Sequence, residues 1–130
     1  MTGHRVAGRT WYPQKVAEHE ITAQVLAAER TAILGRLVRL ELELSGIVES
    51  GSAGADDEHD PEGATLAFER QHAAALLGQA RLHLAEIEAA MLRLADGDYG
   101  RCAGCGEPID AARLAARPTA TTCIRCASQG

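Results

Sequence analysis

Aromatic side chains are scarce in this sequence, which has one Trp, two Tyr and one Phe among 130 residues. Aromatic and β-branched residues favour strands, whereas the Ala and Leu that supply most of the apolar mass here favour helices. The shortage of large side chains also argues against a big globular core. The composition therefore predicts an all-α fold.

Long apolar runs and an excess of positive charge are missing as well. No run of 18 apolar residues exists, so no helix is expected to span a membrane. The N-terminus has basic residues but no apolar stretch of signal-peptide length, so we expect a cytoplasmic protein. The formal net charge of −5 does not favour attraction to bare nucleic acid.

Two segments carry apolar residues at alternating steps of three and four, the pattern of one face of a coiled coil. The first lies within residues 16–50, and its seam residues are Leu26, Ile33, Leu37, Leu40, Leu44 and Ile47. The second spans residues 61–96, with seam residues Ala73, Leu77, Ala80, Leu84, Ile87, Met91 and Leu94. Two long amphipathic helices joined by one loop predict a long antiparallel hairpin. Its register is open, since Leu37 can lie opposite Ala73 or, one heptad away, opposite Ala80.

Both registers place the turn of the hairpin in an acidic segment. Residues 51–54 contain two glycines that interrupt the first helix, and Pro61 is well suited to the first position of the second. Asp60 can cap that helix. Residues 56–62 carry five acids and no Lys or Arg: Asp56, Asp57, Glu58, Asp60 and Glu62. The segment is either a solvated loop or a tip presented to a cationic or metal-bearing partner.

The remaining segments complete the predicted domain organisation. Residues 1–15 contain two glycines and a proline and no helical pattern, so we expect a flexible arm there. Residues 16–96 form the coiled-coil hairpin, with its tip near 51–62. Residues 97–130 form a small C-terminal domain with short helices, one of them predicted over residues 111–116 and ended by Pro118.

Four cysteines predict one metal site in this last domain. Their spacing is Cys-x2-Cys, seventeen residues, then Cys-x2-Cys, and the ligands are Cys102, Cys105, Cys123 and Cys126. Four thiolates complete the tetrahedral coordination of one Zn²⁺ per chain and leave no position open for a substrate, so the zinc is structural. Arg101 and Arg125 beside the ligands can offset the negative charge. The competing interpretations are a redox dithiol or disulfides.

No pattern in the sequence indicates catalysis. A Ser/His/Asp arrangement, a glycine-rich phosphate loop and an HExxH motif are all lacking. We therefore predict no catalytic and no cofactor-binding residues besides the zinc ligands, and no enzymatic activity. A second metal site formed by His59 and two neighbouring acids is an alternative interpretation of the tip.

The sequence of the C-terminal domain resembles a known family. The run Gly-Asp-Tyr-Gly-Arg-Cys-Ala-Gly-Cys-Gly-Glu-Pro-Ile (97–109), the run Arg-Leu-Ala-Ala-Arg-Pro-Thr-Ala (113–120) and Cys-Ile-Arg-Cys (123–126) are similar to the DksA/TraR family of bacterial zinc-finger transcription factors. The resemblance implies direct binding to RNA polymerase without binding to promoter DNA. It also implies that the coiled coil enters the secondary channel, where its tip modulates transcription initiation.

The resemblance also suggests which residues act at the tip. The family motif is Asp-x-x-Asp-x-Ala. Asp57 and Asp60 match its aspartates, and Glu62 stands where the family has Ala. An offset alignment uses Asp60, Glu62 and Ala64 instead. Three polymerase-facing residues are therefore expected: Asp57, Asp60 and Glu62.

A response to the nucleotide ppGpp is not expected, and two other functions compete with the first. Arg117 matches one of the basic residues that family members use for ppGpp, but Glu86 and Ala127 at the other two positions cannot pair with phosphate. One alternative is a Gre-like transcript-cleavage-stimulating factor, since carboxylates suit Mg²⁺. The other is a nucleic-acid-binding zinc module.

Overall fold

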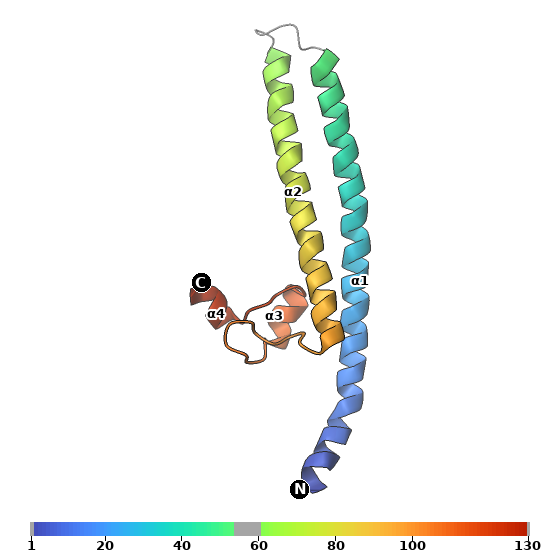
Figure 1. The fold of residues 1–130 in the computed structure, drawn as a ribbon, viewed down its shortest axis with the longest axis vertical. Coiled ribbons are helices and arrows are strands. Elements are labelled where there is room, and N and C mark those ends of the chain that lie inside the picture. The colour runs from blue at the N-terminus through green and yellow to red at the C-terminus, as the bar shows by residue number, and fades with distance from the viewer. Residues whose placement is uncertain (1, 54–60, 130) are drawn as a thin grey trace. The chain divides into compact units, whose positions relative to one another are not determined.

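The computed structural model describes the backbone of residues 2–53 and 61–129, and the side chains of residues 18–50 and 63–129. Two long helices, α1 (Thr2–Ala53) and α2 (Pro61–Asp96), run side by side in opposite directions (Figure 1). Two short helices, α3 (Ala111–Ala116) and α4 (Ile124–Gln129), follow. The described residues contain no strand, only one isolated antiparallel bridge between Arg101 and Pro108. The predicted all-α hairpin is therefore confirmed.

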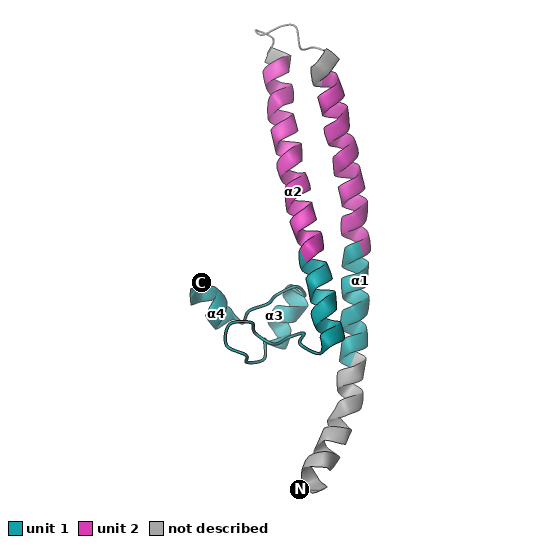
Figure 2. Ribbon diagram, viewed as in Figure 1, with its two compact units in different colours: residues 1–30, 86–130 teal, residues 31–85 magenta. Residues whose placement is uncertain are grey.

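The chain forms two compact units, and each unit contains part of both long helices (Figure 2). One unit is formed by Met1–Arg30 together with Glu86–Gly130, and the other by Thr31–Ala85. The finger segment after Asp96 thus belongs to the same unit as the C-terminal end of α2.

The unit of residues 31–85 is a two-helix coiled coil. Its buried core consists of predicted seam residues, all at most 8% exposed: Ile33, Leu37 and Leu40 from α1, and Ala73, Leu77 and Ala80 from α2. Neighbouring positions such as Arg39 are exposed. Burial at steps of three and four is what a heptad pattern requires, because it keeps one stripe of each helix against its partner.

The other unit has a core of two parts. Leu26 of α1 and Ile87 and Ala90 of α2 are fully buried in the helical part. In the finger segment, Cys102, Ile109 and Ala120 are at most 7% exposed. The finger therefore has a small apolar core of its own, of which a metal-ligand candidate is part.

An ion pair in this unit selects the register of the helices. Arg30 of α1 donates from Nε and Nη2 to one carboxylate oxygen of Glu88 in α2, over 3.2 and 3.1 Å. The register with Leu37 opposite Ala80 places Arg30 opposite Ile87, one residue from this contact. The alternative register would place Arg30 opposite Ala80, two turns away along α2.

The helix ends follow the predicted boundaries except at the N-terminus. Helix α2 begins at Pro61 and ends at Asp96, and α3 covers residues 111–116, as predicted. Helix α1 ends at Ala53, three residues past the predicted end.

At its start, α1 extends back to Thr2, where the sequence predicted an arm without helical pattern. Extending an existing helix needs no new nucleus, so low-propensity residues can be included. The flexibility of the arm stays a prediction.

Among the described residues, no helix combines the length and the apolarity that a crossing of the bilayer requires.

Candidate metal centre

A glycine ends α2 and turns the chain toward the cysteines. Gly97 has a φ of 83°, in the left-handed region that favours glycine. Its N–H donates to the carbonyl of Leu94, and the N–H of Asp98 donates to the carbonyl of Arg93 at 2.9 Å. These two bonds form a Schellman motif, which satisfies the last carbonyls of the helix. The finger therefore begins at a fixed point.

The first cysteine pair lies in a tight loop closed by backbone hydrogen bonds. The N–H of Cys102 donates to the carbonyl of Glu107 at 2.8 Å, and the N–H of Gly106 donates to the carbonyl of Cys102 at 2.9 Å. The φ of Gly106 is 77°, in the left-handed region that favours glycine. Gly104 has another role, since a Cβ built on it would lie only 3.0 Å from Cys126 Sγ. The loop thus comes close to the second pair.

The second pair is positioned by α3 and α4. Cys123 directly precedes α4, and Cys126 lies in its first turn. Arg113 of α3 donates from Nε to the carbonyl of Thr122 at 2.8 Å, which holds the segment just before Cys123. The hydroxyl of Tyr99 donates to the carbonyl of Pro118 at 2.7 Å. These bonds tie the segment between the two pairs to the start of the finger.

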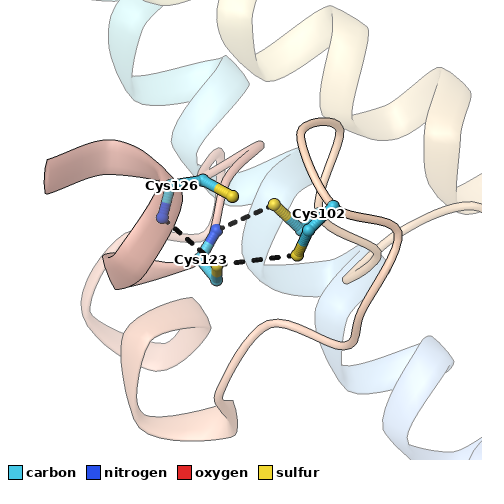
Figure 3. Close-up of side chains that lie close together, drawn as sticks. Cys102, Cys123 and Cys126 are labelled. Atoms are coloured by element: carbon cyan, nitrogen blue, oxygen red, sulfur yellow. Dashed lines mark hydrogen bonds between the residues drawn. The ribbon is translucent and has the colours of Figure 1, made fainter. Parts of the chain in front are cut away.

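The four sulfurs converge on one point. All four Sγ atoms lie within 4.8 Å of one another, and the Sγ atoms of Cys105 and Cys123 are 3.9 Å apart. In Figure 3, Cys102 comes from one loop, and Cys123 and Cys126 face it from the segment around the start of α4. A tetrahedral Zn²⁺ with bonds of 2.3 Å needs sulfurs about 3.8 Å apart. The donor set therefore fits zinc in number, element and spacing.

The electrostatics of the thiols also favour a cation. Backbone N–H groups of Cys123, Cys105 and Gly104 lower the pKa of Cys102 to about 6, so that thiol ionises readily. Hydrogen bonding with the sulfurs of Cys102, Cys123 and Cys105 raises the pKa of Cys126 to about 12. Four thiols this close cannot all lose their protons unless a positive charge lies among them. A bound Zn²⁺ supplies that charge, and four protein ligands leave it no open position.

The structure does not describe the side chains of the other predicted site residues. Asp57 and Asp60 lie outside the described residues, as does His59, and so does the proposed Asp60 cap. Glu62 is part of α2, but its side chain is also outside the described residues. Among the described residues, the four cysteines are the one group of three or more potential metal ligands. Asp110 directly precedes α3 but makes no side-chain capping hydrogen bond.

Sequence reasoning missed several residues that support the site. It did not find α4, whose six residues are too short for a periodic signal. It also did not find the bonds from Tyr99 and Arg113 to carbonyl oxygens, because a side chain that contacts the backbone of a distant segment leaves no pattern in the sequence.

Known proteins resemble both the finger and the hairpin. Residues 97–129 match the family model described as the prokaryotic dksA/traR C4-type zinc finger. The chain is 39% identical over 79 residues to the uncharacterised protein YteA of Bacillus subtilis, a match that covers 61% of this chain and 33% of YteA. It is 51% identical over 41 residues to the RNA polymerase-binding transcription factor DksA of Caulobacter vibrioides, which covers 32% of this chain and 29% of that protein. These matches span about a third of the length of the curated relatives.

A solved structure matches over most of the chain. The transcription factor DksA2 from Pseudomonas aeruginosa superposes with a TM-score of 0.73 and is 31% identical. The match covers 87% of this chain and 82% of that one, so it extends well beyond the finger into the long helices. On the strength of the finger motif and of this match, the chain belongs to the DksA/TraR family.

Proposed function

We propose that this protein is a transcription regulator that binds RNA polymerase directly. The observation that carries the proposal is the match to DksA2, because it includes the long helices and not the zinc finger alone. Relatives such as that of Caulobacter vibrioides are named as RNA polymerase-binding transcription factors. For a protein with a partner of this kind, we propose a cytoplasmic location.

The hairpin is the part that we propose enters the secondary channel of the polymerase. A coiled coil of two helices is narrow, and the buried seam of residues 33–40 and 73–80 makes it stable without a globular core. Helix α2 alone is 36 residues long, about 54 Å at 1.5 Å per residue. The acidic segment between the two helices would then reach deep into the polymerase.

Asp57, Asp60 and Glu62 are the residues that we propose face the polymerase and modulate initiation. Their carboxylates lie in a segment with five acids in seven residues, which repel one another and so do not stabilise the hairpin. The chain contributes a shape and a charge at this place, and the polymerase contributes the chemistry. The zinc finger has a structural role, and we propose no binding of ppGpp and no sequence-specific binding of DNA.

The first experiment measures binding and transcription with purified bacterial RNA polymerase. The protein should be retained by immobilised polymerase and should change the yield of run-off transcripts. The variant Asp57→Asn should still bind but lose the effect on transcription. Glu69→Gln removes an exposed acid of α2 away from the tip and serves as the matched control, with full activity expected.

Three results would contradict the proposal. A wild-type protein that neither binds polymerase nor changes transcription would refute the function as a whole. Equal activity of wild type and Asp57→Asn, with binding confirmed, would refute the role of the tip. Cleavage of stalled transcripts would instead identify a Gre-like factor, and retardation of bare DNA in a gel would identify a nucleic-acid-binding module.

A further inference from the structure

Helix α2 carries a second row of residues at alternating steps of three and four, on its solvent-exposed side. Within the unit of residues 31–85, the buried seam of this helix follows Ala73, Leu77 and Ala80. The second row is exposed along its whole length. We call it the outer stripe, and it consists of Phe68, Gln71, Ala75, Gly78, Leu82 and Ala85. This part of α2 therefore has two heptad faces, of which the described residues bury only one.

The composition of the outer stripe is unusual for a face in contact with water. Phe68 and Leu82 are 70% and 62% exposed. The charged residues in this part of α2, Glu69, Arg70 and Arg81, all lie off the stripe. Because the outward face of a soluble helix normally carries charged and polar residues, a row of exposed apolar residues without charge indicates a partner.

Gly78 lies near the middle of the stripe and faces open space. A Cβ built on it would have no atom within 4 Å. Glycine inside a helix costs about 1 kcal/mol relative to alanine, and packing within the hairpin gains nothing from it here. The lack of a Cβ lets another backbone come close. A second helix packed against the stripe would use this property.

The stripe is complementary to itself when two copies of α2 run antiparallel. If Ala75 of one copy lies opposite Gly78 of the other, the two stripes align over their whole length. The opposed pairs are then Ala75 with Gly78, Phe68 with Ala85, and Gln71 with Leu82. The largest side chain faces an alanine, and the smallest residues meet at the centre, where the helices come closest. Such a contact is isologous, because the same surface serves both copies.

Charge does not oppose this arrangement. Arg81 flanks the stripe, and in the antiparallel pair it lies beside Ala74 of the second copy. The two Arg81 residues are about 14 Å apart along the helix axis at 1.5 Å per residue. This separation exceeds the screening length of about 8 Å at physiological ionic strength, so their repulsion is weak.

The size of the stripe indicates how strong the contact can be. The stripe is about 26 Å long at 1.5 Å per residue. Burying it in both copies removes on the order of 1,000 Å² from water, which is the lower limit for a specific interface. Such a contact suits a reversible complex and not a permanent one.

We propose that the outer stripe is a self-association surface, through which the α2 helices of two copies of this chain pack antiparallel in a reversible dimer. The occupant is a second copy because the stripe supplies both halves of the contact without opposing like charges. The proposal does not rest on the proposed binding to polymerase.

The test measures the mass of the full chain loaded with zinc by sedimentation equilibrium over a range of concentrations. A non-chelating reductant is present, because the exposed Cys105 could otherwise form disulfides between chains. Leu82→Glu places a charge on the stripe. Leu42→Glu places the same charge on α1 and is the matched control, since Leu42 is 69% exposed. The double variant of Gln71→Lys with Leu82→Glu puts opposite charges at positions that face each other only between copies.

We expect the wild type to change from one chain to two with a dissociation constant of about 10–100 µM, as the small area implies. Leu82→Glu should raise this constant about 10-fold or more. Adding Gln71→Lys should reverse most of that loss, because each dimer then has two pairs of opposite charge. Leu42→Glu should associate as the wild type does. Circular dichroism should be the same for all four proteins, since every substituted residue is exposed.

Four results would overturn the proposal. The first is a wild type that stays monomeric over the whole range. The second is equal weakening by Leu42→Glu and Leu82→Glu, which would assign the effect to bulk charge. The third is a double variant that associates no better than Leu82→Glu, which would exclude the antiparallel arrangement. The fourth is a monomeric wild type whose retention on immobilised polymerase is lost in Leu82→Glu, which would assign the stripe to that partner.

Discussion

Arg30 and Glu88 lie 58 positions apart in the sequence and form an ion pair of 3.1 Å between the two long helices. Their side chains are 42% and 47% exposed, so water screens the interaction. A double-mutant cycle with Arg30→Ala and Glu88→Ala should give a coupling free energy of about 0.2–1 kcal/mol that decreases with added salt. Denaturant unfolding measures it, and the pair Arg39→Ala and Glu88→Ala, which should be additive, is the control. A coupling above about 2 kcal/mol would contradict this picture of a solvated pair.

Leu40 is 6% exposed within the seam of the coiled coil. Leu40→Ala should lower the free energy of unfolding by roughly 2–5 kcal/mol, since it removes buried contacts and leaves a cavity. Arg39→Ala, on the neighbouring exposed position, should cost far less. Leu84→Ala should cost less than Leu40→Ala, because Leu84 is only half-buried. Chemical denaturation measures these changes. Equal decreases in the free energy of unfolding for Arg39→Ala and Leu40→Ala would be incompatible with a buried seam at Leu40.

The hydroxyl of Tyr99 donates to the carbonyl of Pro118 over 2.7 Å. Tyr99→Phe should therefore destabilise the protein by about 1 kcal/mol through loss of one half-buried hydrogen bond. Zinc content should stay at one ion per chain, because the tyrosine does not contact the sulfurs. Thermal unfolding and elemental analysis of the same samples check both statements. Unchanged stability would show that water replaces the hydroxyl without cost.

Cys105→Ser tests the metal centre itself. A hydroxyl is a poor ligand for zinc compared with a thiolate, so the variant should lose the metal. Because metal affinity in such sites is largely folding free energy, the finger after Asp96 should lose its order while most of the hairpin remains helical. Elemental analysis and circular dichroism measure the two effects. Wild-type protein without zinc, when purified in the absence of chelators, would refute the metal assignment.

The pKa values of the thiols determine how many protons the protein should release when it binds zinc. At pH 7 the metal-free protein has Cys102 largely ionised, with a pKa of about 6, and Cys126 protonated, with a pKa of about 12. Binding should therefore release at least one proton but fewer than four. Calorimetry in buffers of different ionisation enthalpy counts them.

The sign of the pH dependence follows from the same pKa values. Metal binding lowers every thiol pKa, so the stability gained from zinc is present at high pH and is lost as the pH falls. The loss should steepen below about pH 6, where Cys102 of the metal-free chain also takes up a proton. An affinity for zinc that does not change between pH 5 and 8 would contradict the thiolate site.

Much of the architecture is predictable because it depends on local rules. The seam from Ile33 to Leu40 follows heptad steps, and Pro61 can stand at the start of a helix but rarely within one. The cysteine spacing predicted a cluster that the structure brings within 4.8 Å. These features need no knowledge of distant contacts.

The remaining features depend on pairs of distant residues or on cooperative effects. The register was ambiguous by one heptad, since Leu37 packs equally well against Ala73 or Ala80. Only a contact such as that of Arg30 with Glu88 distinguishes the two. The predicted start of α1 was wrong because the prediction gave too much weight to the glycines and the proline. Once a helix has nucleated, adding a further residue to it costs little free energy. The positions of Asp57 and Asp60 stay predictions.

The closed loop around the first cysteine pair has a consequence for the order in which the site assembles. Backbone hydrogen bonds at 2.8 and 2.9 Å close this loop within a few residues of chain. The pair at residues 102–105 is therefore spaced by contacts within one short loop, whereas the pair at 123–126 lies at the start of a helix of six residues. Once the ion is held by the first pair, the tether between the pairs keeps the second at a high effective concentration. Capture should thus proceed as a chelation in two stages, and release should run through the same half-bound intermediate in reverse.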